Sequence, residues 1–221
     1  PRTFSSAASD VYKRQKEDSP ENGVPTPNSN FGLLMRIYFN GCSWTWGNEL
    51  ENRDDRFSKL ISKRLNAEEV NKSKSGCSNF YIMRTSLEEN PQNYDIAIIQ
   101  LTKRNRTEYY DTKSKRWANV HQSLLRRGSP HHNKPHEDHI DWWTDYYRNI
   151  YSSEYGFAYE KLAYTAIKGH WGSTPLIITT INADGESYDL RLEDKKYPRL
   201  PKKHPNRIGH WMIANDIMKL I

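Results

Sequence analysis

The chain has 221 residues, of which 35% are hydrophobic and 27% charged, and this length suits one domain with a substantial core. The 33 Lys and Arg against 27 Asp and Glu give a net charge of +6, and because the two signs are interspersed, the charge indicates a solvated surface. Two cysteines exclude a disulfide framework, and no apolar run reaches the roughly 18 residues of a membrane-spanning helix, so we expect a cytoplasmic protein.

The first 34 residues are rich in Ser, Ala, Asp, Asn, Pro and Gly and lack apolar periodicity, which predicts a disordered leader. Within it, the segment 4–15 resembles translated sequencing-adapter read-through, which would make the leader an artefact of gene prediction and Met35 the start. We therefore expect one folded domain over residues 35–221.

The first half of this domain predicts strands alternating with helices. Residues 33–39 form an apolar run that ends in an Asn-Gly pair, which is typical of a buried strand followed by a turn. Asp54 or Asp55 is expected to cap the next helix, and a weaker strand follows over residues 67–71. The apolar stripe of that helix comprises Phe57, Leu60, Ile61 and Leu65.

The turn 73–78 supplies a possible N-cap for another helix, and the nearly continuous apolar run 94–101 predicts the central strand of a parallel sheet. Regular patterning stops over about 102–141, which predicts a long insertion of functional loop. The apolar stripe expected for the helix comprises Phe80, Met83 and Leu87.

Residues 141–168 predict a long helix with a break near Gly156, and residues 175–181 predict the last strand. The final segment, 206–221, predicts an amphipathic helix. Strands that alternate with helices indicate an α/β layer architecture around a mostly parallel sheet. The apolar stripe expected for the final helix comprises Ile208, Trp211, Ile217 and Leu220.

Candidate catalytic residues follow the predicted strands. In an open parallel sheet, ligands collect where loops leave the carboxyl ends of the strands, and Ser43, Gly76 and Thr102 all fall in such loops. A serine hydrolase needs a base that takes the hydroxyl proton and donors aimed at the oxyanion. His204, just before the final helix, is the candidate base.

Two blocks of sequence resemble those of the SGNH (GDSL-type) hydrolases. The segment Gly41-Cys-Ser-Trp-Thr-Trp-Gly47 resembles the first block, Gly-Asp-Ser-x-x-x-Gly, with Cys42 in place of the aspartate; His204-Pro-Asn-Arg-Ile-Gly209 resembles the last. Gly76 is similar to the second-block glycine. The resemblance implies a flavodoxin-like three-layer α/β/α domain and an esterase of acyl or carbohydrate esters that works through an acyl-serine intermediate. It implies Ser43 as nucleophile, His204 as base, and the amides of Ser43 and Gly76 as oxyanion donors.

Two positions depart from the family pattern. The third block, Gly-x-Asn-Asp in the family, is here Gln-Leu-Thr-Lys-Arg-Asn-Arg, so Thr102 or Asn105 is expected to complete the oxyanion hole. Pro201 stands where the family has an aspartate, so the histidine would depend on a backbone carbonyl or on a remote acid such as Asp194. These departures keep a non-catalytic glycan-binding or structural module of SGNH type as the main alternative.

The surroundings of the predicted site contain further candidates. Cys42, Trp44 and Trp46 would line a substrate pocket, with core packing as the alternative. Cys77 is expected to be a free buried thiol, with a redox-sensitive pair with Cys42 as the alternative. His210 is expected to be a packing or surface residue.

Two clusters in the insertion suggest other functions. The run 131–139, with Asp141 after it, offers imidazole and carboxylate ligands, but its irregular spacing favours a polar lid or substrate loop, so we expect no metal and no cofactor. The basic aromatic stretch 113–127 suggests a nucleic-acid-binding domain as a lesser alternative. No nucleic-acid recognition motif accompanies this stretch, so we expect the protein to bind a small-molecule or glycan ester and neither nucleic acid nor membrane. The sequence leaves the oligomeric state open.

Overall fold

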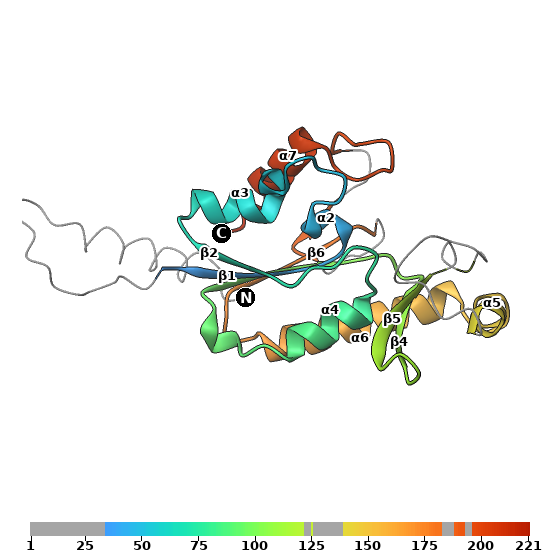
Figure 1. The fold of residues 1–221 in the computed structure, drawn as a ribbon. Coiled ribbons are helices and arrows are strands. Elements are labelled where there is room, and N and C mark those ends of the chain that lie inside the picture. Colours follow the sequence, from blue (N-terminus) through green and yellow to red (C-terminus); the bar gives the residue numbers. More distant parts are fainter. Residues whose placement is uncertain (1–33, 122–124, 126–138, 183–187, 193–195) are drawn as a thin grey trace, which may run out of the picture.

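The structure is a computed structural model that describes residues 34–121, 125, 139–182, 188–192 and 196–221. All but one residue of the predicted leader therefore lies outside the described residues. Five parallel strands form the main sheet, in the order β2–β1–β3–β6–β7 (Figure 1). The strands are β1 Arg36–Asn40, β2 Glu68–Asn71, β3 Ile96–Leu101, β6 Leu176–Thr180 and β7 Leu190–Arg191.

Helices cover both faces of this sheet. Figure 1 shows α3 (Phe57–Arg64) and α7 (Arg207–Met218) on one face and α4 (Asn79–Leu87) and α6 (Ser153–His170) on the other. The three-layer α/β/α class and the flavodoxin-like strand order are thereby confirmed. All six residues of β3 are buried, as expected of a central parallel strand with helices on both sides.

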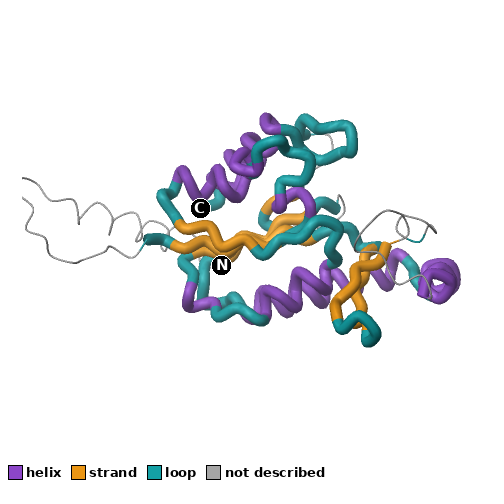
Figure 2. Tube along the Cα trace, in the orientation of Figure 1, coloured by secondary structure: helices purple, strands orange, loops and turns teal. Residues whose placement is uncertain are grey.

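The insertion after β3 contains regular structure, so the expectation of an irregular stretch is wrong for its first half. Strands β4 (Arg106–Asp111) and β5 (Arg116–His121) pair in an antiparallel hairpin, which Figure 2 shows beside the main sheet. Polar residues occupy buried positions of β4, including Glu108 and Asp111, and they hide the alternation that predicts a strand.

The predicted helix over 141–168 is two helices, α5 (Ile140–Asn149) and α6, and the chain breaks between them, not near Gly156. Ser152 caps α6, because its hydroxyl accepts a hydrogen bond from the Tyr155 amide at 3.1 Å. Gly156 lies inside α6, where a Cβ atom would approach Arg104 Cβ to 3.1 Å. The glycine therefore marks a close contact instead of a helix end.

The sequence predicts the N-cap of α4 correctly and that of α3 wrongly. Ser78 caps α4, since its Oγ accepts from the Tyr81 amide at 3.1 Å, as expected. The cap expected at Asp54 or Asp55 is wrong, because both residues lie in a 3₁₀ turn (Arg53–Asp55) before α3.

The apolar stripes expected for α4 and α7 are shifted. The buried face of α4 carries Asn79, Ile82 and Ser86, and in α7 Ile208 and Trp211 are 61% and 53% exposed. The prediction considered apolar residues alone. The buried faces also contain polar side chains that form hydrogen bonds inside the protein, so the true faces differ from the predicted ones. The residues that α7 buries are Gly209, His210, Ile213, Ala214 and Ile217, so His210 packs in the core as expected.

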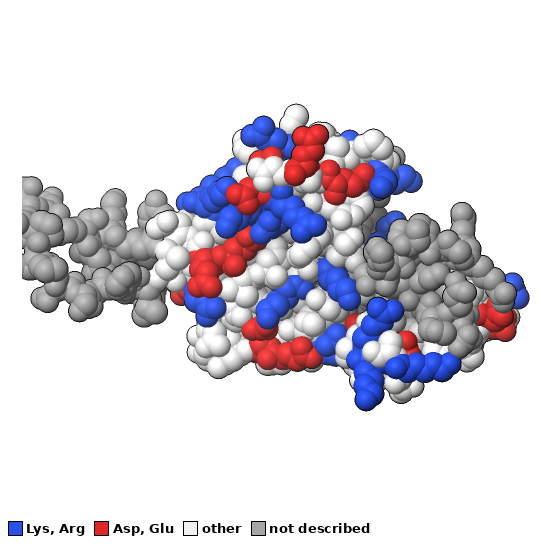
Figure 3. Space-filling model, in the orientation of Figure 1, with Lys and Arg blue, Asp and Glu red and all other residues white. Residues whose placement is uncertain are grey.

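Charges of both signs share the surface. Figure 3 shows Lys and Arg beside Asp and Glu over α3 and β2, where Arg56 pairs with Glu69 at 2.7 Å and Lys63 with Asp54 at 3.1 Å. This mixture agrees with the solvated surface predicted from the sequence.

Candidate active site

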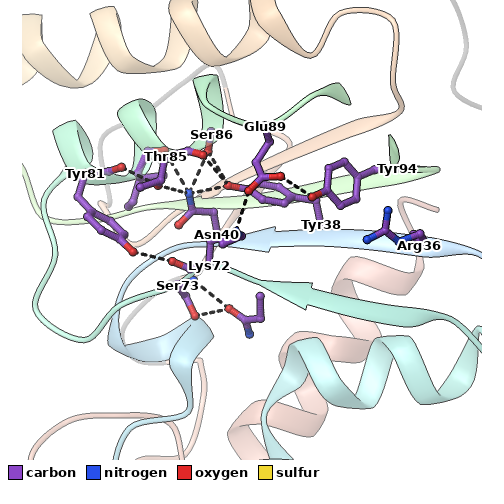
Figure 4. A network of polar contacts seen from close by, with 12 residues as sticks. Arg36, Tyr38, Asn40, Lys72, Ser73, Tyr81, Thr85, Ser86, Glu89 and Tyr94 are labelled. Atoms are coloured by element: carbon purple, nitrogen blue, oxygen red, sulfur yellow. Dashed lines mark hydrogen bonds and ion pairs between the residues drawn. The ribbon is translucent and has the colours of Figure 1, made fainter. Parts of the chain in front are cut away.

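The turn that carries Ser43 follows β1 directly, as the one-turn helix α2 (Ser43–Trp46). A buried polar network holds its start (Figure 4). The side chain of Asn40 accepts from the Gly41 amide at 2.8 Å and donates to the hydroxyls of Thr85 and Ser86 at 2.8 and 3.0 Å. The last residue of β1 is therefore fixed against α4, and Ser43 leaves the sheet from a defined point.

Packing against β3 fixes the other side of the turn. The Thr45 hydroxyl donates to the Gln100 side chain at 2.5 Å, and a Cβ at Gly41 would lie only 2.9 Å from Gln100 Cβ. Only glycine fits at this close approach. Cys42 is fully buried and its sulfur accepts from Nε2 of the Gln100 side chain at 3.4 Å, so this thiol faces β3.

The two tryptophans expected in a substrate pocket take different positions. Trp44 is 5% exposed, and the Arg199 guanidinium lies 5.1 Å from its ring centroid. Trp46 is half-buried beneath Arg53, whose guanidinium lies 4.5 Å from the ring centroid. The Arg199 contact places the segment before α7 against α2.

The loop after β2 lies against the serine turn. The Lys74 amide and the Cys77 thiol both donate to the Gly41 carbonyl, at 3.0 and 3.3 Å. This brings Gly76, which has a φ of 74°, beside the residues that precede Ser43. The Gly76 amide makes no backbone hydrogen bond to any described residue, and the Ser43 amide is at the first helical position, where no intrahelical acceptor exists. Within the described part of the chain, neither amide donates to another backbone group.

The loop after β3 forms hydrogen bonds with the segments around it. The Thr102 amide donates to the Asn79 side chain at 2.7 Å, so this amide is already used. The Thr102 hydroxyl accepts from Arg106 at 3.1 Å, and the Asn105 carbonyl accepts from the Tyr147 hydroxyl at 3.0 Å. The structure therefore places Asn105 at the junction of the hairpin and α5, and Thr102 beside the Gly76 loop.

A carboxylate that the sequence analysis missed contacts the candidate base. His204 Nδ1 forms a hydrogen bond with the Glu49 carboxylate, whose other oxygen accepts from the Lys202 amide at 3.2 Å. Desolvation raises the pKa of Glu49, but the hydrogen bonds from His204 and Lys202 outweigh it and hold the pKa below its ordinary value. Glu49 is therefore a carboxylate at neutral pH.

The two loops that carry Glu49 and His204 each contain a residue with strained backbone. Glu49 and Lys203 both have positive φ, 68° and 72°, a region that costs a non-glycine residue about 1–3 kcal/mol. Local hydrogen bonds hold each loop, from the Asn48 amide to the Ser43 carbonyl at 2.9 Å and from the Leu200 amide to the His204 carbonyl at 2.8 Å. Such strain concentrates at functional sites, where surrounding contacts fix it.

No hydrogen bond joins Ser43 to His204 among the described residues. Within the part of the chain that the structure describes, the only hydrogen-bond partner of the Ser43 hydroxyl is Cys42 sulfur, at 3.9 Å. Glu49 follows Ser43 by six residues and contacts His204, so one short segment carries both the candidate nucleophile and the partner of the candidate base.

The sequence motifs do not identify Glu49 as the acid that contacts the histidine. The family pattern places the acid before the histidine, where Pro201 stands, whereas Glu49 follows the serine block. Asp194, the remote acid considered from the sequence, lies outside the described residues.

Most of the histidine-rich run also falls outside the described residues, which include only His139 of it; that ring contacts the Tyr109 hydroxyl at 3.1 Å. In the described ranges no group of three or more His, Cys, Asp and Glu side chains is arranged to hold a metal ion. None of the helices described there combines the length and the apolar character needed to cross a bilayer.

Comparisons with known proteins give likeness in structure alone. No protein-family model and no curated protein matches the chain. It is similar to a protein described as lipolytic and of the G-D-S-L family from Desulfitobacterium hafniense DCB-2, with 10% identity over 85% of this chain and 99% of that one and a TM-score of 0.49. It is also similar to a family two carbohydrate esterase from Clostridium thermocellum, solved with cellohexaose, with 12% identity over 90% of this chain and 65% of that one and a TM-score of 0.47.

Proposed function

We propose that the chain is a serine-dependent ester hydrolase in which Ser43 attacks the ester, His204 takes the serine proton and Glu49 orients the imidazole. The Glu49–His204 hydrogen bond supports this proposal most strongly, because it joins the segment after Ser43 to the segment before α7. Substrates would be small-molecule or glycan esters.

The proposed mechanism depends on which nitrogen of the His204 ring contacts Glu49. With Nδ1 held by the Glu49 carboxylate, Nδ1 carries the proton and Nε2 is the acceptor that removes the serine proton. The carboxylate then stabilises the imidazolium, and the amides of Ser43 and Gly76 donate to the oxyanion. The imidazolium protonates the leaving alcohol, and water, activated by the same ring, hydrolyses the acyl-serine.

One observation favours the alternative of a non-catalytic glycan-binding or structural module. Ser43 is 5% exposed, and its hydroxyl makes no hydrogen bond to the His204 ring within the described residues. Catalysis then requires a rotation of the serine or the imidazole side chain when substrate binds, since catalytic hydrogen bonds often tighten only in the substrate complex.

Hydrolysis of 4-nitrophenyl acetate separates the two functions. The wild-type protein and a Ser75→Ala variant, which changes a half-buried serine in the neighbouring loop, should both release 4-nitrophenol, and Ser43→Ala should not exceed the uncatalysed rate. Equal rates in the wild-type protein and Ser43→Ala would reject the hydrolase proposal.

A further inference from the structure

The side chain of Arg106, the first residue of the β4–β5 hairpin, contacts two loops at the carboxyl end of the main sheet. Its Nη1 atom donates to the Cys77 carbonyl at 3.3 Å and to the Thr102 hydroxyl at 3.1 Å. Cys77 lies in the loop after β2, and Thr102 lies in the loop after β3. One nitrogen of the guanidinium therefore joins the two loops.

Thr102 is held firmly by its other contacts. Its amide donates to Oδ1 of Asn79 at 2.7 Å, and its carbonyl accepts from the side-chain amides of Asn79 and Asn182, at 3.1 and 3.0 Å. Asn79 begins α4 and Asn182 follows β6, so the backbone of Thr102 is attached to two other segments. Because Thr102 is also fully buried, the hydroxyl that Arg106 contacts has a defined position.

The hairpin that carries Arg106 is held against α4. The Glu108 carboxylate, whose side chain is fully buried, forms an ion pair with Arg84 of α4 at 3.2 Å. The same guanidinium lies 4.6 Å from the centroid of the Trp117 ring in β5. Figure 1 shows the hairpin on the side of the sheet that α4 covers. The position of Arg106 is therefore set by contacts of the hairpin on which it lies.

The loop that contains Gly76 needs such contacts to hold one conformation. Glycine has more backbone freedom than any other residue, and a Cβ atom at Gly76 would meet no atom beyond its two chain neighbours within 4 Å. The Lys74 amide and the Cys77 thiol attach this loop to the Gly41 carbonyl, at 3.0 and 3.3 Å. The bond from Arg106 adds a further attachment, at the carbonyl of the residue that follows Gly76.

We propose that Arg106 is a positioning residue of the hydrolase, which holds the loop so that the Gly76 amide is directed at the oxyanion. This inference rests on the proposed function. A charged guanidinium makes stronger hydrogen bonds than a neutral donor, and here it acts through the loop and not on the substrate. An amide that is oriented in advance stabilises the charge that develops in the transition state, so loss of Arg106 should lower kcat more than it changes KM.

Kinetics with 4-nitrophenyl acetate test the catalytic consequence. Arg106→Met should lower kcat at least about tenfold and change KM less than about threefold, whereas Arg116→Met, at an exposed position of the same hairpin, should change neither. Because one nitrogen makes both hydrogen bonds, a lysine can replace the arginine in part, and Arg106→Lys should give a kcat between those of Arg106→Met and the wild-type protein. Equal kcat values for Arg106→Met and Arg116→Met would overturn the proposal.

Hydrogen exchange of backbone amides tests the positioning without depending on turnover. In Arg106→Met, the hydrogen-bonded amides of Lys74 and Cys77 should exchange about tenfold faster, while those of β1 and β3 keep their wild-type rates. Thr102→Val removes the hydroxyl that Arg106 contacts and keeps the shape of the side chain, so it should speed exchange in the same loop. This second variant keeps the test valid if Arg106→Met fails to fold. Unchanged exchange of the loop in the folded variants would overturn the proposal.

The two measurements separate this inference from the proposed function. Turnover of 4-nitrophenyl acetate by the wild-type protein tests the hydrolase, and exchange tests the loop. Faster loop exchange in Arg106→Met without any turnover by the wild-type protein would reject the hydrolase alone. Wild-type turnover that Arg106→Met retains in full would reject the positioning role alone.

Discussion

Glu49 and His204 are 155 positions apart in the chain, and their side chains form a hydrogen bond at the carboxyl end of the sheet. The pair gives His204 the carboxylate that Pro201 cannot supply. Because Glu49 lies on the segment that carries Ser43, the pair also links the position of the candidate base to that segment. The nucleophile and the acid of the proposed triad therefore lie on the same segment after β1.

Removing the Glu49 charge should impair turnover while preserving the fold. In Glu49→Gln, the imidazole loses the carboxylate that fixes its tautomer, a change that costs up to about 10⁴ in kcat in a true triad. The measurement is the kcat for 4-nitrophenyl acetate, with Glu51→Gln, an exposed neighbour, as control. An equal kcat for the two variants would show that Glu49 does not act on the histidine.

Loss of the Asn40 side chain should destabilise the protein. Asn40→Ala leaves buried acceptors on α4 and the Gly41 amide without their partner, which should lower the free energy of unfolding by about 2–3 kcal/mol. Urea denaturation measures this difference, and Asn149→Ala, at an exposed position of α5, should change it by less than about 0.5 kcal/mol. A loss no larger than that of the control would contradict the role given to the network.

The two glycines of α6 should respond in opposite directions to alanine. Gly156→Ala forces a methyl group against the Tyr151 hydroxyl and Arg104, and should destabilise the protein by about 1–3 kcal/mol. Gly169→Ala meets no atom within 4 Å and should stabilise the helix by about 0.5–1 kcal/mol. Thermal unfolding of both variants checks the contrast, which equal shifts in Tm would contradict.

Buried His210 should make stability depend on pH. Burial, with the charges of His204 and Arg56, lowers the pKa of His210 to about 3, from an ordinary 6.5. Between these values the unfolded chain binds a proton that the folded chain does not, so the free energy of unfolding falls by about 1.4 kcal/mol for each unit of decreasing pH.

The variant His210→Asn tests this dependence, because the amide oxygen can still accept from the Phe57 amide but does not titrate. Its free energy of unfolding should fall less steeply than that of the wild-type protein between pH 6 and 4. Parallel curves for the two proteins would show that His210 is not the group that titrates.

Continuous apolar runs made the sheet predictable. Strands β1, β3 and β6 are buried on both faces, and their apolar segments have few other interpretations. The β4–β5 hairpin was not predictable in this way, because Glu108 occupies a buried position and pairs with Arg84, a contact 24 residues away in sequence. Polar side chains satisfied by distant partners break the patterns on which such predictions depend.

The candidate site was predictable where it depends on a local motif. Ser43 and His204 stand in recognisable blocks, whereas Glu49 contacts His204 only because the folded chain brings their two loops together. No neighbour in sequence marks Glu49 out.

Covalent labelling with a fluorophosphonate, followed by mass spectrometry of the peptides, tests the proposed triad most directly. The account predicts one adduct, on Ser43, formed at a rate that falls at least a hundredfold in His204→Ala and in Glu49→Gln. An adduct on another serine, or labelling of Ser43 at an unchanged rate in both variants, would contradict it.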